Sequence, residues 1–306
     1  METKKVIYSG AVLLLIIAAM LVANFLENTK EKRTFMPFFP KFVEQAGGIV
    51  LTQGENSVIL SKRDGLWFVA LSAVPDLQYA ADSVKILSVV QKIAEMRQDN
   101  FVSRNRDNFA LYGLVGDSVY SVQIYDRDGR QTGDFLLGRR AENWRFNYFR
   151  LANSNDVFLV SGGIGFAFNS EINEWRDRRM FHFNPAEVVE IIAIENGIRK
   201  GASKDSAGVW TFADGSPANP EAMTNYINEF FALTAGDWDY TYSLPDEITG
   251  LANPAAHYTL ISSNGSSITL AVGNPDGERP RFFVRYNDNP QVSFVFRSQI
   301  QRLRFQ

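Results

Sequence analysis

The first strong hydrophobic pattern of the chain is an uncharged apolar stretch close to its beginning. Residues Val6–Leu26 contain no Asp, Glu, Lys or Arg, and Lys4 and Lys5 precede them. A helix over this stretch is about 30 Å long, which matches the hydrocarbon layer of a bilayer. With the positive-inside rule, the pattern predicts a transmembrane helix over residues 6–26, a cytoplasmic tail over residues 1–5 and a body outside the cytoplasm.

The same stretch has an alternative interpretation as a cleaved signal peptide. Its hydrophobic region then covers Ala11–Ala23, with cleavage after "LVA" at residues 21–23. Leu21 stands where a small residue is usual, and the apolar character continues through Leu26. We therefore expect an uncleaved anchor, although both interpretations place the body outside the cytoplasm.

Prolines mark the next segment as irregular. Residues 27–44 contain Pro37 and Pro40, which discourage a helix. We interpret this segment as a linker into the first domain. The alternative is that its aromatic part, Thr34–Phe42, lies on a membrane surface.

Beyond residue 44, one pattern of apolar and polar positions occurs twice. Trp67 in "LWFV" matches Trp210 in "VWTF", and we expect both rings to be buried between a sheet and a helix. Asp82 is a good N-cap for the first helix, and Asn219 followed by Pro220 is a good start for the second. Apolar stripes at helical spacing predict the buried faces of these helices: Ile86, Val90 and Ile93 in the first, and Met223, Ile227 and Phe230 in the second.

The match continues after the helices. Further matched positions are Gly113 with Gly250, Gly138 with Gly273, and Arg150 with Arg285. Between them, "DRDG" at 126–129 and "SNG" at 263–265 predict hairpin turns, the second of type I′.

Together these signals predict the fold class. We expect an α+β protein with an N-terminal transmembrane helix followed by two tandem copies of an antiparallel-sheet-plus-helix unit. Each copy is expected to hold two or three strands, one helix and about four more strands. The first unit covers residues 45–168, a connector covers 169–186, and the second unit covers 187–306.

The composition limits the chemistry of the chain. It contains no Cys, which excludes disulfides, thiolate zinc sites and cysteine nucleophiles. With only His182 and His257, an all-histidine metal site is poorly supplied. The net charge of −3 gives a nucleic-acid partner no electrostatic support. We therefore predict no cofactor, no metal site and no nucleic-acid partner.

Four short motifs suggest functional sites, and each has a simpler interpretation. "DRDG" lacks the later ligands of a calcium loop, and "SGGIG" (161–165) lacks the Lys-Ser/Thr of a phosphate loop, so we interpret both as turns. "RDRR" (176–179) is interpreted as a solvated part of the connector rather than an anion site. "GDWDYTY" (236–242) combines carboxylates with aromatic residues, as sugar sites do, but Asp237 and Asp239 define no cleft. We predict no catalytic residue.

In the order of its motifs the chain resembles a known family, domain of unknown function 4340, found in bacterial membrane-associated proteins. The carrying residues are Trp67, "YGL" (112–114), "LLG" (136–138), Tyr148-Phe149 and "WRDRRMFHFNPAEV" (175–188). The resemblance spans residues 47–303, although the second copy keeps only Gly250-Leu251 of "YGL". It implies a single anchor helix in the bacterial inner membrane and a body in the periplasm or outside the cell. No catalytic residues are established for the family, so none is carried over to this chain. Some relatives look like companions of gliding-motility-type ABC transporter components.

These features favour a non-enzymatic, membrane-anchored extracytoplasmic binding or assembly module. Its partners would be the membrane, through Val6–Leu26, and other envelope or transporter proteins. The alternative is an envelope glycan-binding protein or a carboxylate-dependent hydrolase. Aromatic residues lining a cleft beside two carboxyl groups would favour the alternative, and a broad apolar surface without a cleft would favour the module.

Overall fold

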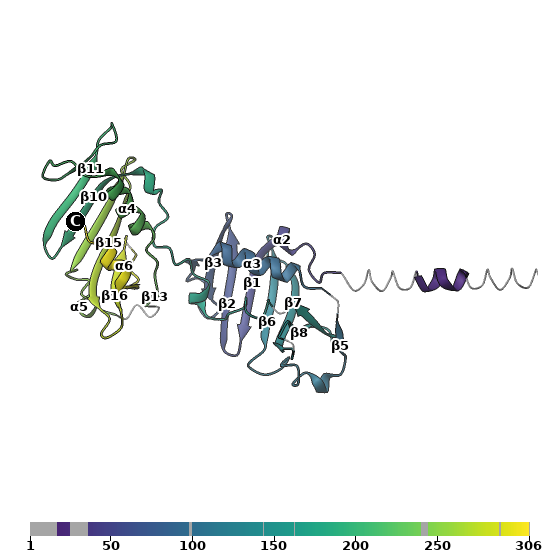
Figure 1. Cartoon of the computed structure of the whole chain (residues 1–306). Coiled ribbons are helices and arrows are strands. Elements are labelled where there is room, and N and C mark those ends of the chain that lie inside the picture. The colour runs from purple at the N-terminus through teal and green to yellow at the C-terminus, as the bar shows by residue number, and fades with distance from the viewer. Residues whose placement is uncertain are drawn as a thin grey trace, which may run out of the picture. The chain divides into compact units, whose positions relative to one another are not determined.

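A computed structural model describes residues 17–24, 36–97, 100–142, 144–161, 163–239, 244–287 and 289–305 of the 306-residue chain. The chain divides into two compact units, Met1–Asp177 and Arg178–Gln306. Each unit is built on one large antiparallel sheet (Figure 1). The division falls inside the range 169–186 that we interpreted as a connector.

The first unit contains a nine-stranded sheet. Its strands are β1 (Ala46–Gln53), β2 (Asn56–Arg63), β3 (Leu66–Leu71), β4 (Tyr79–Ala80), β5 (Phe101–Ser103), β6 (Tyr120–Asp126), β7 (Gln131–Arg140), β8 (Phe146–Leu151) and β9 (Val157–Ser161). They lie in the order β4-β3-β2-β1-β6-β7-β8-β9-β5. Alternate residues of the central strands are buried, which is the pattern of a sheet with one face on a core. The helices are α2 (Phe42–Gln45), α3 (Ser83–Ala94), η1 (Arg106–Asn108) and η2 (Ile172–Glu174).

The second unit contains an eight-stranded sheet. Its strands are β10 (Val188–Glu195), β11 (Ile198–Lys204), β12 (Trp210–Phe212), β13 (Asp237–Trp238), β14 (Ala256–Ser262), β15 (Ser267–Pro275), β16 (Arg281–Tyr286) and β17 (Ser293–Phe296). They lie in the order β12-β11-β10-β14-β15-β16-β17-β13. The helices are η3 (Pro185–Glu187), α4 (Pro220–Phe231), α5 (Asp246–Thr249) and α6 (Arg297–Arg302).

The two strand orders differ in one strand. In the second unit, β10–β12 take the positions of β1–β3, β14–β17 those of β6–β9, and β13 that of β5. In place of β4, the second unit has an isolated bridge between Thr211 and Pro217. Both sheets are larger than we expected, because β4, β5 and β13 are only two or three residues long and carry almost no periodic signal.

One capped helix per unit packs on the core. Asp82 accepts hydrogen bonds from two backbone N–H groups of the first turn of α3, and Asn219 does the same for α4. The predicted stripes are buried: Ile86, Val90 and Ile93 in α3, and Met223, Ile227 and Phe230 in α4. Trp67 and Trp210 are 2% and 4% exposed. The predicted caps, helix faces and buried tryptophans are therefore confirmed.

The predicted hairpin turns form, but the type I′ assignment at "SNG" was wrong. The N–H of Gly265 bonds to the carbonyl of Ser262, and only the glycine has a positive φ, of 84°. A type I′ turn needs positive φ at both central residues, here Ser263 and Asn264. The "DRDG" turn has the same geometry, with Gly129 at φ 77°.

The residues around the division between the units are partly packed, so the solvated interpretation of "RDRR" was wrong for Arg176, which is buried, whereas Arg179 is exposed. Trp175 and Arg176 are buried, and the Arg176 guanidinium lies 3.9 Å from the ring centroid of Tyr79. After the division, Phe181 stacks on Phe230 of α4 with centroids 4.8 Å apart. Tertiary contacts therefore override the polar local sequence.

The predicted transmembrane helix is contradicted. In the part of the chain that the structure describes, no helix is long and apolar enough to cross a membrane. Apart from residues 17–24, the stretch Val6–Leu26 lies outside the described residues, as do the predicted tail 1–5 and residues 27–35. The single-pass anchor, and the inner-membrane location derived from it, are accordingly not retained.

Candidate functional site

Several hairpin turns of this chain place glycine at one particular position. In each of these turns, one N–H bonds to the carbonyl oxygen three residues earlier. The residue that donates this bond has a left-handed backbone, and it is a glycine in four turns: Gly129, Gly208, Gly215 and Gly265. Glycine takes this conformation without strain because it lacks a Cβ. In the β7–β8 turn the N–H of Trp144 bonds to the carbonyl of Ala141 at 2.9 Å, and Trp144 takes the left-handed backbone with φ 59°. This turn therefore carries a bulky side chain where its counterparts carry none.

Neither backbone preference nor core packing accounts for Trp144. A left-handed backbone costs a residue with a Cβ about 1–2 kcal/mol. The other described non-glycine residues with positive φ are Asp64, Asn100, Asn196 and Asn287, whose short polar side chains tolerate it. The Trp144 side chain is 71% exposed and gains little from burial. A strained, exposed aromatic residue of this kind indicates a role at the surface.

One arginine contacts two exposed rings. The Arg140 guanidinium, at the end of β7, lies 5.7 Å from the ring centroid of Trp144 and 3.1 Å from that of Phe166. Phe166 follows β9 in the chain and is also 71% exposed. Cation–π contacts at exposed sites contribute about 0.5–1 kcal/mol each. These contacts restrict the side-chain conformations of Trp144 and Phe166.

The residues next to Arg140 and Trp144 are held in place by contacts with other parts of the first unit. Arg139 lies 5.5 Å from the ring centroid of Tyr148, which stacks on Tyr112 with centroids 4.6 Å apart. The Arg139 Nε donates to the carbonyl of Leu111, whose side chain is exposed. Gly138 of β7 lets the backbone at Tyr112 approach this strand closely, because a Cβ at Gly138 would lie 2.3 Å from the Tyr112 carbonyl oxygen.

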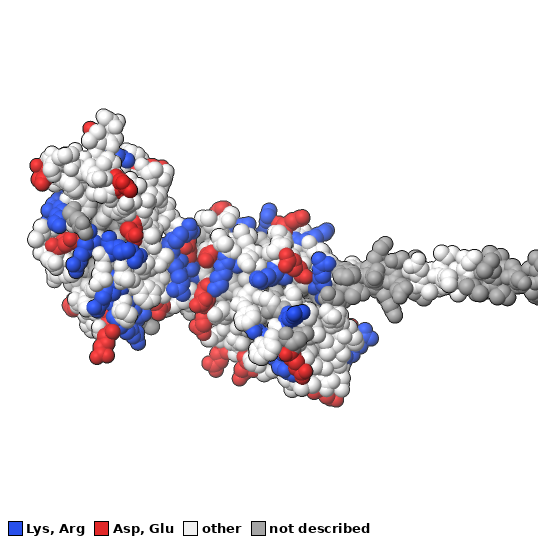
Figure 2. Space-filling view, in the orientation of Figure 1, with Lys and Arg blue, Asp and Glu red and all other residues white. Residues whose placement is uncertain are grey.

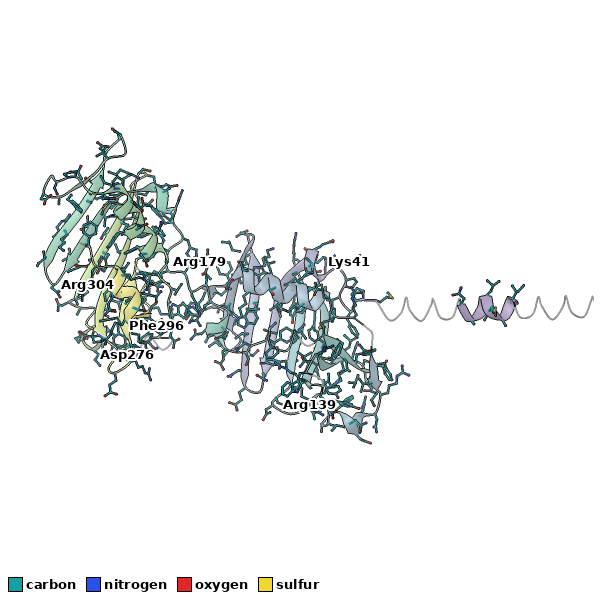
Figure 3. The ribbon with its side chains drawn as sticks, viewed as in Figure 1. Lys41, Arg139, Arg179, Asp276, Phe296 and Arg304 are labelled. Carbon is teal, nitrogen blue, oxygen red and sulfur yellow. The ribbon has the colours of Figure 1, made fainter. Side chains whose placement is uncertain are left out.

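We define the Trp144 surface as the exposed residues Leu111, Arg139, Trp144 and Phe166 together with the half-buried Arg140. Figure 3 marks its side of the first unit by Arg139. Within the described ranges, neither Arg139 nor Arg140 forms an ion pair with a carboxylate. The surface therefore combines exposed apolar groups with two guanidinium groups whose charge is not neutralised by an ion pair.

The corresponding hairpin of the second unit is built differently. Between β15 and β16, Asp276 forms ion pairs with Arg281 at 2.6 Å and with Arg279 at 3.6 Å. The turn residue with positive φ is a glycine, Gly277. Its charges thus pair within the hairpin, and the hairpin has no counterpart of Trp144.

The carboxylates of "GDWDYTY" take separate structural positions. Asp237 lies in the edge strand β13, with Oδ2 3.9 Å from Nη1 of Arg281. Asp239 is buried, and its Oδ2 accepts a hydrogen bond from the backbone N–H of Leu244 at 3.1 Å. Residues 240–243 of the motif lie outside the described residues. These contacts tie Asp239 to the backbone rather than presenting it as an acid or base.

The remaining motifs form turns, as interpreted. In "DRDG", Asp126 Oδ1 accepts hydrogen bonds from the N–H groups of Asp128 and Arg130. In "SGGIG", the N–H of Ile164 bonds to the carbonyl of Ser161, while residue 162 is not described. Among the described residues, no cluster of three His, Asp or Glu side chains is placed to hold a metal ion. The Asp126 carboxylate of "DRDG" therefore holds its own hairpin turn.

The sequence interpretation missed the Trp144 surface. One signal was present in "RRAENWR" (139–145), which connects two predicted strands without the glycine found in "DRDG" and "SNG". It also carries three arginines against one acidic residue. The approach of Phe166 had no local signal, because it depends on β8 and β9 bringing residues 163–168 back to the end of β7.

Comparison with known proteins identifies a family but names no activity. The chain matches the model of the family Domain of unknown function (DUF4340) over residues 73–247. That range covers more than half of the chain and includes α3, the Trp144 surface and α4. No curated protein shows significant similarity to the chain. The chain thus belongs to the DUF4340 family.

Proposed function

We propose that this protein is a non-enzymatic binding module that docks a partner protein on the Trp144 surface. The partner segment would present an apolar side chain flanked by acidic residues. The observation that carries the proposal is Trp144, exposed and left-handed at a turn position where the matching hairpin turns have glycine. Its side chain weakens the fold locally, so its benefit must come from outside the fold.

The residue types of the surface are those that dominate protein interfaces. Trp and Arg are enriched among the residues whose truncation costs most binding energy. Arg139 and Arg140 present planar groups that pair with carboxylates through two parallel hydrogen bonds. Trp144 and Phe166 supply apolar area, and their contacts with Arg140 orient them in advance. The surface is small, so a peptide segment suits it better than a broad domain face.

Assembly in an envelope, transporter or gliding-motility complex stays a prediction from the family resemblance. The alternative of a carboxylate-dependent hydrolase gains no support from Asp239, whose carboxylate accepts a backbone hydrogen bond. Glycan binding is the stronger alternative, because exposed tryptophan also suits sugar rings. We therefore include it as an outcome of the test.

The test uses peptide display and a glycan array, because neither requires a known partner. The chain should select peptides with an apolar residue between acidic residues. Trp144→Gly should weaken the binding of a selected peptide by about thirtyfold, as expected for an interface residue worth about 2 kcal/mol. Arg140→Gln should weaken it less. Phe101→Ala is the matched control, because Phe101 is another exposed ring beside an arginine, Arg104.

The same variant separates binding from folding. Trp144→Gly removes the left-handed strain, so it should raise the free energy of unfolding by about 1 kcal/mol while binding falls. Selected peptides that bind Trp144→Gly as well as wild type would refute the proposal. Glycans that require Trp144, in the absence of such peptides, would establish the glycan-binding alternative.

A further inference from the structure

The second unit contains a groove of about 530 Å³ between α6 and one end of the sheet. Its floor has Ala256 and Tyr258 of β14, Val272 of β15 and Phe282 of β16. Ala256 and Phe282 are half-buried and supply the apolar surface of the floor, whereas Tyr258 and Val272 are almost fully buried. A groove of this size is in the range of small-molecule sites.

The wall of the groove is one face of α6 and its continuation. Arg297 and Gln301 line it from one face of α6, and Arg304 lines it two residues beyond the last residue of the helix, Arg302. The wall is held from behind, because Arg302 Nε forms an ion pair with Glu229 Oε2 of α4 at 2.6 Å.

The charges of the wall favour an anion. Among the described residues, neither Arg297 nor Arg304 forms an ion pair with a carboxylate. Figure 2 shows Lys and Arg surface gathering on this face of the second unit, where Figure 3 marks Arg304. The chain as a whole has a net charge of −3, so attraction of an anion to this place must come from local groups.

The acidic residue of the groove is already engaged. Glu195 Oε1 accepts hydrogen bonds from the Tyr258 hydroxyl at 2.8 Å and from the backbone N–H of Phe305 at 3.3 Å. Burial raises the pKa of Tyr258, as does its hydrogen bond to Glu195, so the phenol stays neutral. Arg297 and Arg304 therefore share the groove with the carboxylate of Glu195, which already accepts hydrogen bonds from two other groups.

The equivalent place in the first unit is filled by side chains. Tyr120 and Leu137 form a cross-strand pair there, as Ala256 and Val272 do in the second unit. The ring of Phe168 lies 5.9 Å from that of Tyr120 and is buried. The second unit has a small residue, Ala256, where the first has a tyrosine, and this substitution leaves room for the groove.

We propose that the groove binds an elongated organic anion with an apolar body and an acidic group at each end. The body lies over Ala256 and Phe282, and the acidic groups pair with Arg297 and Arg304. The two arginines are seven residues apart in the chain, so the ligand must be long enough to place one acidic group at each. This site lies in the second unit and does not depend on the Trp144 surface.

The test is isothermal titration of the full chain with decanedioate, and with 1,10-decanediol as the uncharged probe of the same length. Decanedioate should bind with a 1:1 stoichiometry, and decanediol at least tenfold more weakly. Arg304→Gln should weaken decanedioate binding about tenfold, because it removes one charged hydrogen-bonding group. Ala256→Tyr should abolish binding, because it places in the groove the residue that the first unit has. Arg127→Gln, an equal change of charge in a hairpin turn of the first unit, should have no effect.

The proposal is overturned by any of three results. These are no decanedioate binding at millimolar concentration, equal binding of decanediol, and unchanged binding by both Arg304→Gln and Ala256→Tyr. Hydrogen exchange of the β14 amides shows whether each variant keeps its sheet, so a loss of binding cannot be mistaken for unfolding. Loss confined to folded variants of the groove supports the site.

Discussion

Each unit has an arginine at the same position in its sheet, but the groups that contact the guanidinium differ between the units. In the second unit, Arg285 of β16 makes two hydrogen bonds to Asp246, of 2.9 and 2.8 Å. In the first, Arg150 of β8 lies 4.7 Å from the ring centroid of Phe109. Phe109 and Asp246 are equivalent positions, each four residues before the matched glycine of its unit.

Backbone carbonyls complete the site in the first unit. Arg150 Nη1 donates to the carbonyls of Leu151, Ala152 and Ser154 at 3.0–3.2 Å. Burial lowers the pKa of Arg150, and the neighbouring Arg106 lowers it further. In the second unit, the hydrogen bond to Asp246 raises the pKa of Arg285. Both units thus keep a guanidinium group at this position, while the groups that contact it differ: a carboxylate in the second unit, and carbonyls and a ring in the first.

Larger differences lie at the ends of the same strands. The β7–β8 hairpin carries Trp144, whereas the β15–β16 hairpin pairs its charges internally. The groove is filled by Tyr120 and Phe168 in the first unit and open in the second. In a duplicated fold, we expect functional sites where the two copies differ, because packing of the core explains the features that the copies share.

The strongest test of the shared framework is the tryptophan pair. Trp67→Ala and Trp210→Ala should each lower the free energy of unfolding of their own unit by about 3–5 kcal/mol, because both rings are almost fully buried. Hydrogen exchange of the strand amides measures the loss in each unit separately. A loss below about 1 kcal/mol for one of them would show that the two cores are not equivalent.

A smaller effect is expected at the matched glycines. A Cβ at Gly138 would lie 2.3 Å from the Tyr112 carbonyl oxygen, and one at Gly273 would lie 2.1 Å from that of Thr249. Gly138→Ala and Gly273→Ala should therefore each cost about 1–3 kcal/mol through overpacking against backbone. Gly163→Ala is a suitable control, since its nearest neighbour is the flexible end of Lys92 at 3.5 Å. Equal stability of all three variants would contradict the close approach.

The smallest effect separates the two arginine sites by pH. The hydrogen bonds from Arg285 lower the pKa of Asp246 below its ordinary value. A lowered carboxyl pKa stabilises the fold above the unfolded pKa of about 3.9, and this contribution is lost as the pH falls through the folded pKa. The pair is partly exposed, so it contributes less than about 1 kcal/mol.

Arg285→Gln should accordingly destabilise the second unit at pH 7 and much less at pH 3. Arg150→Gln should destabilise the first unit by a similar amount at both pH values, because its partners are carbonyls and a ring. The measurement is the free energy of unfolding of each variant relative to wild type at both pH values. A pH-dependent loss for Arg150→Gln and a constant one for Arg285→Gln would reverse the assignment.

Local signals were reliable where the chemistry itself is local. An N-cap acts on the N–H groups two and three residues later, so Asp82 and Asn219 predicted the starts of α3 and α4. The apolar uncharged run at Val6–Leu26 is also a local signal, yet among the described residues no helix is long and apolar enough to cross a membrane.

By itself, the sequence determined the internal repeat, the two capped helices and the tryptophan cores of this protein, because caps, periodicity and matched aromatic residues are properties of short segments. Only the tertiary structure decided the two candidate sites. Phe166 reaches Arg140 through the pairing of β7, β8 and β9, and the groove joins β14–β16 to the last residues of the chain. Contacts between residues far apart in the chain depend on strand order and register, which no local pattern specifies.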